Sequence, residues 1–326
     1  MSPASSTTTS ASATGTATGS RLEVRKTYKL YVNGAFPRSE SGRVYAVHAA
    51  SRGRGAAAGA GSRTGALLGN VAQGSRKDAR DAVVAARAVV AGWAGATAYN
   101  RGQVLYRVAE VMQGRAAQLA AEVADAEGLT AARAAATVAA AIDRWVWYAG
   151  WSDKLPQVLG GLNPVAGPYF DLSVPEPTGV VAVLAPQGSS LLGLASVIAP
   201  VIVSGNTCVV LASERRPLPA VDLAECLATS DLPGGVVNLL TARTAEVAPW
   251  LASHRDVDAL DLTGAADAPG VDWGALERAA ADSVTRVLRP AGTGPAAIEP
   301  DWTAEPGLGR MTAFLETKTV WHPKGI

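Results

Sequence analysis

The stretch VLAPQGSSLLGLA, residues 183–195, contains an apolar run, a short polar turn and then a second apolar run. This pattern predicts a buried strand that turns directly into a helix. In α/β proteins ligands usually bind at such a junction, beyond the carboxyl end of a strand. Two interpretations are open at this point: the turn cradles a cofactor, or it is only the chain reversal that the fold requires.

Few side chains could act as nucleophiles or metal ligands. Cys208 lies in the apolar run TCVVLA and Cys226 in the helical pattern AVDLAECLA. We expect both to be buried, reduced thiols, because free cysteine is among the residues most often buried. The three histidines, His48, His254 and His322, are far apart and lack the spacing of metal ligands. The sequence therefore predicts no metal site, and no GxSxG motif supplies a serine nucleophile.

Length and composition limit the class of protein. The 326 residues, of which 48% are hydrophobic, can bury one large core or two smaller ones. The formal net charge of +1 gives no field that would favour nucleic acid or an anionic membrane surface as a partner. The chain opens with many Ser, Thr, Ala and Gly residues, which predicts a disordered tail over residues 1–27 rather than a signal peptide. We expect a cytoplasmic protein.

The first half of the chain is predicted to be mainly helical. A hairpin begins at Tyr28 and turns at Asn33 and Gly34, because an Asn-Gly pair between alternating residues is a strong turn signal. A Gly-, Ala- and Arg-rich segment over residues 49–65 is expected to be a flexible insertion. Apolar residues then recur at helical spacing, which predicts three helices over residues 75–93, 101–128 and 130–149.

Strands and helices alternate in the second half. Residues 155–178 are punctuated by Gly and Pro and are predicted to form an extended ribbon. Four apolar runs separated by helical segments follow, and they are the expected strands: GVVAVLAP, TCVVLAS, VVNLLT and VDALDLTG. This order predicts an α/β fold with a parallel sheet of the dinucleotide-binding, Rossmann-like type. Periodicity disappears from Pro290 to Gly309, and the chain closes on the strand-like segment LETKTVW.

Several blocks of the sequence resemble the aldehyde dehydrogenase superfamily. YAGWSDK, GPYF and EPTGVV are similar to the family's YAGWADK, GPYF and EPVGVV. SGNT, PGGVVNLL and HRDVDALDLTG are similar to its AGNT, PPGVVNIV and HPDVDKVAFTG. The ends KLYVNGAF and GLGRMTAFLETKTVWHP also match, so the likeness covers most of residues 28–290 and 307–323.

The resemblance implies a division of the chain into parts. The implied parts are a Rossmann-like domain, a β-ribbon used for oligomerisation, and a linker that stands in place of most of the catalytic domain. The corresponding residues are 28–154 and 176–290 for the domain, 155–175 and 310–323 for the ribbon, and 291–309 for the linker.

By this resemblance five positions fall in the family's cofactor-binding stretches and are the candidate contacts: Pro186, Gly188, Glu214, Thr263 and Gly264. Three positions, Gly188 among them, depart from the family's residue types. Gly188 replaces the asparagine that helps to bind the oxyanion, Leu211 replaces a lysine that grips the ribose, and Ala265 replaces a serine. We therefore expect no bound cofactor, with NAD(P) binding left as an open alternative.

The resemblance also implies that the catalytic machinery is missing. Family members attack an aldehyde with a cysteine thiolate and use a glutamate to activate the deacylating water. No cysteine follows Cys226 here, and VLRPAGTG stands where the family has ELGGK. Glu299 and Asp301, in the predicted linker, are expected to lack partners. We predict no catalytic residue and expect that the chain alone is not an enzyme.

The ribbon and the terminal strand match the family pattern best. In the family they form a small sheet that pairs with the edge of a neighbouring subunit's catalytic domain. The sequence therefore favours a non-catalytic subunit that stabilises or regulates a full-length aldehyde dehydrogenase in a hetero-oligomer, with a homo-oligomer as the other arrangement. Two alternatives remain open. The first is an NAD(P)-dependent oxidoreductase of small aldehydes, which would need an unrecognised nucleophile or one lent by a partner. The second is a defunct gene product that is poorly soluble alone.

Overall fold

A computed structural model describes residues 26–50, 65–292 and 298–324. The predicted tail over residues 1–27 and the predicted insertion over residues 49–65 lie almost wholly outside these ranges. At the centre is a five-stranded parallel sheet in the order β10-β9-β6-β7-β8. Its strands are β6 (Val180–Leu184), β7 (Thr207–Leu211), β8 (Val237–Leu240), β9 (Ala259–Asp261) and β10 (Arg286–Leu288).

Helices cover both faces of this sheet, so its central strands are buried throughout. Successive side chains of a strand point to opposite faces, and Val181 and Val183 therefore join one core while Val180 and Ala182 join the other. The first core is covered by α2 (Ala98–Gly114), α3 (Ala116–Glu127), α4 (Ala131–Ala149), α6 (Leu192–Val203) and α7 (Leu218–Ala228). The second is covered by α1 (Arg76–Gly95), α8 (Thr244–Ala252) and α9 (Trp273–Ala281).

The four predicted strands are confirmed, and so is the α/β fold class. The sequence analysis missed the fifth strand, β10, which has three residues and pairs in parallel with β9. No apolar run marks it, because Thr285 and Arg286 precede its two apolar residues. Pairing with β9 therefore creates this strand.

Two of the three predicted helices are confirmed, and the long middle one is two helices instead of one. The helix at residues 75–93 begins where its capping signal predicted: the Ser75 side chain accepts hydrogen bonds from the backbone of Lys77 and Asp78. The segment 101–128 is divided at Arg115 into α2 and α3. Arg115 leaves the helical conformation, and its guanidinium lies 2.6 Å from a carboxylate oxygen of Glu225 in α7.

The first strands form a small separate sheet in the order β1-β3-β2, with β1 at Thr27–Tyr28, β2 at Val44–His48 and β3 at Leu67–Ala72. The predicted Asn33-Gly34 turn is confirmed: both residues have positive φ, and Val32 bridges Ala35. The flanking residues do not continue as a hairpin, however, because Tyr31 bridges Leu239 of the central sheet instead.

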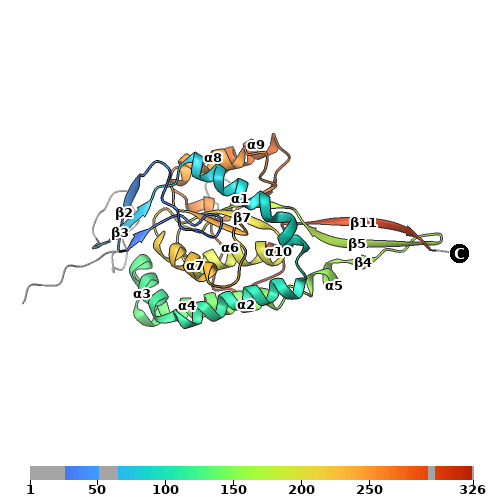
Figure 1. The fold of residues 1–326 in the computed structure, drawn as a ribbon, viewed down its shortest axis with the longest axis horizontal. Helices are drawn as coiled ribbons and strands as arrows, with labels where there is room; N and C mark the ends of the chain where they lie inside the picture. Colours follow the sequence, from blue (N-terminus) through green and yellow to red (C-terminus); the bar gives the residue numbers. More distant parts are fainter. Residues whose placement is uncertain (1–25, 51–64, 293–297, 325–326) are drawn as a thin grey trace, which may run out of the picture.

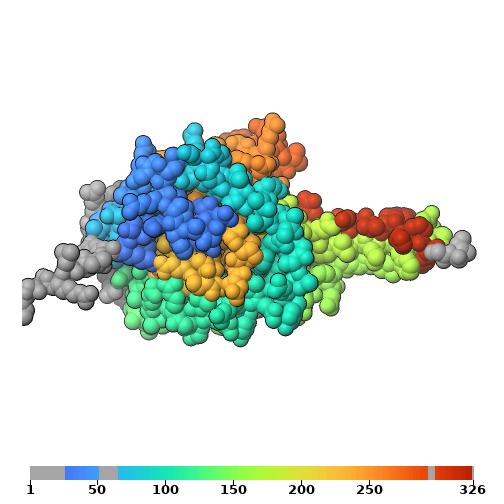
Figure 2. Space-filling model, viewed as in Figure 1, coloured from blue at the N-terminus to red at the C-terminus, as the bar shows by residue number. Residues whose placement is uncertain are grey.

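A long antiparallel ribbon projects from the body (Figures 1 and 2). Strand β5 (Tyr169–Pro177) pairs along its whole length with β11 (Leu315–Pro323), and the short β4 (Gly161–Leu162) borders its other edge. The ribbon predicted over residues 155–178 does not start at residue 155, since Leu155–Leu159 forms the helix α5 with Pro156 in its first turn.

Asn206, in the SGNT block, ties the ribbon to the sheet. Its side-chain amide donates to the carbonyl of Phe314 at 2.8 Å, and its side-chain oxygen accepts from the backbone of Gly179 at 2.7 Å. The Phe314 side chain is fully buried at the base of the ribbon. In the described ranges, no helix is long and apolar enough to cross a membrane.

Candidate functional site

The five candidate cofactor contacts meet at the carboxyl edge of the central sheet. Pro186 and Gly188 follow β6, Glu214 follows β7, and Thr263 and Gly264 follow β9. Strand β6 pairs with both of the others, so the three strand ends are neighbours. The structure thus brings together residues that lie up to 78 positions apart in the chain.

Glu214 already has a partner for each carboxylate oxygen. Oε1 lies 2.8 Å from the Arg243 guanidinium, and Oε2 accepts from the backbone N–H of Thr244 at 2.9 Å, which caps helix α8. The Arg243 guanidinium also lies over the ring of Tyr45. A ribose hydroxyl that approached this carboxylate would therefore have to compete with an ion pair and a helix cap.

The turn after β6 is locked to β7 by Gln187, which the sequence analysis did not select. Its side-chain amide donates to the carbonyl of Ala185 at 3.0 Å, and its side-chain oxygen accepts from the backbone of Glu214 at 3.0 Å. The side chain is 1% exposed. The polar turn itself gave no sign that this residue is buried; a buried amide needs partners, and the fold supplies them here.

The other contacts of the turn are also within the chain. The carbonyl of Gly188 accepts from the guanidinium of Arg216. The backbone N–H and the hydroxyl of Ser190 both donate to one oxygen of Glu127, at 2.7 and 2.6 Å. Pro186 is buried, and a Cβ on Gly193 would lie 2.9 Å from its ring. Tight packing between the turn and the first residues of α6 thus accounts for Pro186 without a ligand.

Thr263 belongs to a buried ion-pair cluster at the end of β9. The Asp261 carboxylate accepts from the Thr263 backbone at 3.0 Å and from its hydroxyl at 2.5 Å. The same carboxylate pairs with Arg310, whose guanidinium also donates to the Thr263 hydroxyl at 3.2 Å. The Thr263 hydroxyl is therefore both donor and acceptor inside the protein.

The predicted linker is not without partners, and the expectation for Glu299 is wrong. Its Oε1 accepts from the backbone N–H of Gln187 at 2.6 Å, and its Oε2 accepts from the Trp302 indole at 3.2 Å. Burial raises the pKa of Glu299, while these hydrogen bonds oppose the shift. Asp301 is exposed, but its carboxylate accepts from the backbone and the hydroxyl of Thr303. The expectation is therefore wrong for Asp301 as well, whose partner lies two residues along the chain. For Glu299 the fold supplied the contact with the turn.

Two groups at this edge that a bound dinucleotide would use already have partners within the chain. A dinucleotide would need an acceptor for its ribose hydroxyls and free N–H donors for its phosphates at this edge. In the conformation described, Glu214 is used by Arg243 and by helix α8, and the Gln187 N–H is used by Glu299. The described residues of this edge thus bind one another where a cofactor would bind.

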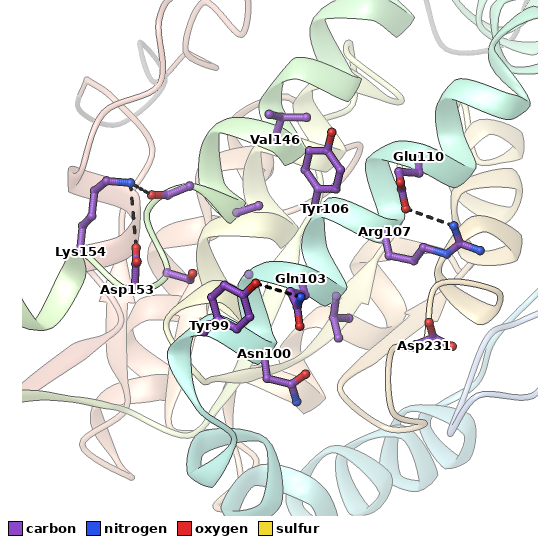
Figure 3. A pocket seen from close by; sticks show the side chains of 15 residues that line it. Tyr99, Asn100, Gln103, Tyr106, Arg107, Glu110, Val146, Asp153, Lys154 and Asp231 are labelled. Atoms are coloured by element: carbon purple, nitrogen blue, oxygen red, sulfur yellow. Dashed lines mark hydrogen bonds and ion pairs between the residues drawn. The ribbon is translucent and has the colours of Figure 1, made fainter.

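A hollow of about 720 Å³ lies elsewhere, against helices α2 and α4 (Figure 3). Tyr99 and Tyr106 of α2 project at its rim and are more than half exposed. Four of the charged side chains that line it pair locally: Arg107 with Glu110 at 3.1 Å, and Lys154 with Asp153 at 4.0 Å. No cysteine or histidine is among its lining residues.

Both cysteines are free and buried, as predicted. Burial raises the pKa of the Cys208 thiol, and it raises that of Cys226 to about 11 although Arg115 opposes the shift. At pH 8 only about one Cys226 thiol in a thousand is therefore ionised. In residues 26–50, 65–292 and 298–324, no three His, Cys, Asp or Glu side chains are placed to hold a metal ion.

We expect neither thiol to react in the folded protein, because the thiolate is the reactive form. Iodoacetamide at pH 8, followed by mass spectrometry of the peptides, should label both cysteines fully in urea. It should label less than about a tenth of either one without urea over the same time. Rapid native labelling of Cys226 would instead identify it as an activated nucleophile.

A polar cluster between β1, α3 and α7 makes stability depend on pH. Burial raises the pKa of Glu122 to about 7, Asp222 adds to the shift, and Lys26 and Tyr28 oppose it. Lys26 itself lies 2.5 Å from a carboxylate oxygen of Asp222. Because the pKa is higher in the folded state, the folded state binds more protons between about pH 4.5 and 7. Stability therefore falls as the pH rises through this window.

Replacing Glu122 by glutamine should remove this cost while keeping an oxygen that can accept from Tyr28. We expect Glu122→Gln to raise the free energy of unfolding by about 1–2 kcal/mol at pH 8, a figure reduced for solvent screening. At pH 5 the gain should be much smaller. Urea titrations at the two pH values test this. An equal gain at both would show that the ionisation of Glu122 is not the cause.

Comparison with known proteins agrees with the fold. Residues 58–287 match the model of the aldehyde dehydrogenase family. Aldehyde dehydrogenase family 2 member B4 of Arabidopsis thaliana is 31% identical over 242 residues, which are 73% of this chain and 42% of that protein. Hydroxyisobutyraldehyde dehydrogenase of Mycolicibacterium austroafricanum is 32% identical over 238 residues, 73% of this chain and 44% of that protein. The chain thus spans less than half the length of these two curated relatives.

Solved structures give the same result for the fold. Betaine aldehyde dehydrogenase from Staphylococcus aureus superposes with a TM-score of 0.72 at 23% identity, over 81% of this chain and 50% of that one. HpcC from Thermus thermophilus superposes with a TM-score of 0.72 at 27% identity, over 82% of this chain and 48% of that one.

Proposed function

Because the chain belongs to the aldehyde dehydrogenase family, we propose that it is a non-catalytic subunit that binds a full-length aldehyde dehydrogenase and stabilises or regulates it. Residues 155–175 and 310–323 would form the oligomerisation ribbon, residues 28–154 and 176–290 the Rossmann-like body, and residues 291–309 the linker between them. The complex would lie in the cytoplasm. A homo-oligomer of this chain is the other arrangement that the same ribbon would allow.

The ribbon carries the proposal, because one of its faces is apolar and open to solvent. The register places Leu162 and Val320 on either side of Leu172, so their side chains share a face. Phe170 and Val174 lie on the same face of β5, since they alternate with Leu172. These five residues, the apolar ribbon face, are each at least 40% exposed. Exposed contiguous apolar surface of this kind marks interaction sites.

The low net charge of this face and the unpaired backbone edge of the ribbon also favour a contact with another protein there. The Lys318 ammonium, on the same face, pairs with Glu176 at 2.9 Å, so the face carries little net charge into a contact. Strand β11 is at the edge of its sheet, where unpaired backbone groups can receive another strand. The opposite face has Ser173 bonded to Thr319 near its middle and the exposed rings of Tyr169 and Trp321 toward its outer end. The ribbon therefore exposes apolar side chains on both faces, but only the apolar ribbon face carries them along most of its length.

The chemistry of the body supports a non-catalytic role. No cysteine follows Cys226 in the sequence, and Cys226 is buried with a raised pKa. The turn Pro186-Gln187-Gly188 has no side-chain amide at Gly188 to stabilise an oxyanion, a donor worth about 2.7–4 kcal/mol of transition-state stabilisation. With its cofactor edge occupied by its own side chains, the chain would bind no NAD(P).

The test is to tag the chain in its native cells, purify it, and identify by mass what comes with it. We expect a full-length aldehyde dehydrogenase in a fixed ratio. Leu172→Glu would place a charge on the apolar ribbon face and should reduce recovery of the enzyme at least tenfold, since an unpaired buried charge costs several kcal/mol. The matched control is Thr317→Glu, which adds the same charge to the opposite face of the ribbon.

Three results would count against the proposal. A stable monomer without an accompanying dehydrogenase would remove the partner. Equal loss of the enzyme in Leu172→Glu and Thr317→Glu would remove the role of the apolar face. Turnover of small aldehydes with NAD(P) by the purified chain would establish the oxidoreductase alternative in its place.

A further inference from the structure

Residues 298–312, here called the join segment, cross the carboxyl edge of the central sheet. They contact the end of β6 through Glu299 and the end of β9 through Arg310. Between these two contacts the Trp302 side chain is buried to 8% exposure. The segment ends in helix α10 (Gly309–Thr312), where Met311 is fully buried. It is therefore a packed part of the fold.

The Glu299 carboxylate occupies an anion position of the turn. One of its oxygens lies 2.6 Å from the backbone nitrogen of Gln187, and a Cβ on Gly188 would lie 3.8 Å from the other. A carboxylate oxygen and a phosphate oxygen make the same demand on a backbone N–H, namely a donor aimed at negative charge. The turn thus holds, from within the chain, the type of group that a nucleotide would present.

Several further contacts hold the carboxylate in place. The Trp302 indole donates to Glu299, and the Arg144 guanidinium donates to the carbonyls of Trp302 and Ala304, both at 2.9 Å. The Arg310 guanidinium lies over the Trp302 ring at 5.5 Å. Because Arg144 belongs to α4 and Arg310 pairs with β9, the segment is attached on both sides of the turn.

We propose that the join segment is an intrachain plug, in which the Glu299 carboxylate takes the place of a ligand phosphate and excludes phosphate-bearing nucleotides from the edge of the sheet. The exclusion is competitive, since carboxylate and phosphate need the same N–H donor. Displacing the segment would expose the turn. This inference does not depend on the partner proposed above, because it concerns contacts within one chain.

Hydrogen exchange of the purified full chain measures the plug directly. In Glu299→Ala the Gln187 amide loses its acceptor, so peptides covering residues 183–192 should exchange about 10- to 100-fold faster than in the wild type, the range that a charge-assisted hydrogen bond predicts. Peptides covering residues 298–304 should also exchange faster. Glu305→Ala is the matched control: Glu305 is exposed in the same segment, and its loss should change neither peptide.

Addition of millimolar NAD+ then tests exclusion. We expect NAD+ to slow exchange of residues 183–192 in Glu299→Ala and to leave the wild type unchanged. Equal protection of the two proteins, or of neither, would overturn the plug, as would unchanged exchange in Glu299→Ala alone. If Glu299→Ala lost its native circular dichroism, Trp302→Phe would replace it, since it removes only the indole donor to Glu299 and should give the same pattern more weakly.

Discussion

Replacing Arg310 by methionine is expected to destabilise the protein by about 3–5 kcal/mol, which a urea titration would show as a large fall in the unfolding midpoint. The reason is that Arg310 is the charged partner of Asp261, whose side chain is 0% exposed. Removing the guanidinium leaves a carboxylate in the interior with only the Thr263 hydrogen bonds. An uncompensated buried charge costs far more than the net gain of the pair.

Two controls separate this cause from a simple loss of packing. Arg310→Lys retains the charge and should cost less than the methionine variant. Asp261→Asn in the Arg310→Met background removes the unpaired charge and should recover most of the loss. If the double variant were as unstable as Arg310→Met alone, the aliphatic part of Arg310 and its contact with the Trp302 ring would be the dominant contribution.

Replacing Gly264 by alanine should cost about 3 kcal/mol or more in the absence of any ligand. A Cβ at this position would lie 2.3 Å from the carbonyl oxygen of Ala185 and 2.4 Å from that of Leu184. These are backbone atoms of β6 and its turn, which cannot rotate away as a flexible side chain can. The loop after β9 therefore needs glycine in order to pack against β6.

Gly92 in helix α1 supplies the matched control, because a Cβ there would have no neighbour within 4 Å. Gly92→Ala should stabilise the protein by up to about 1 kcal/mol, since glycine weakens a helix interior. Thermal unfolding of the two variants distinguishes packing from ligand binding. A Gly264→Ala protein of normal stability would show that this glycine is needed for something other than the fold.

The sequence was sufficient for the central sheet and most of its helices. Runs such as TCVVLA are apolar at consecutive positions, and this is the pattern of a parallel strand with helices on both faces. Helix α1 was predictable because its amphipathic stripe and its Ser75 cap are local signals. Local periodicity missed the break at Arg115, whose guanidinium pairs with α7, and it missed strand β10, which forms by backbone pairing with β9.

The sequence by itself therefore determined the fold class and the buried state of Cys208 and Cys226, because local patterns and the rules of parallel sheets suffice for these. The tertiary structure decided what the five candidate positions contact. Glu214 binds Arg243, Thr263 binds Asp261 and Arg310, and the turn binds Glu299 from 112 residues away. Such pairings depend on distances between segments remote in the chain, which only the folded packing sets.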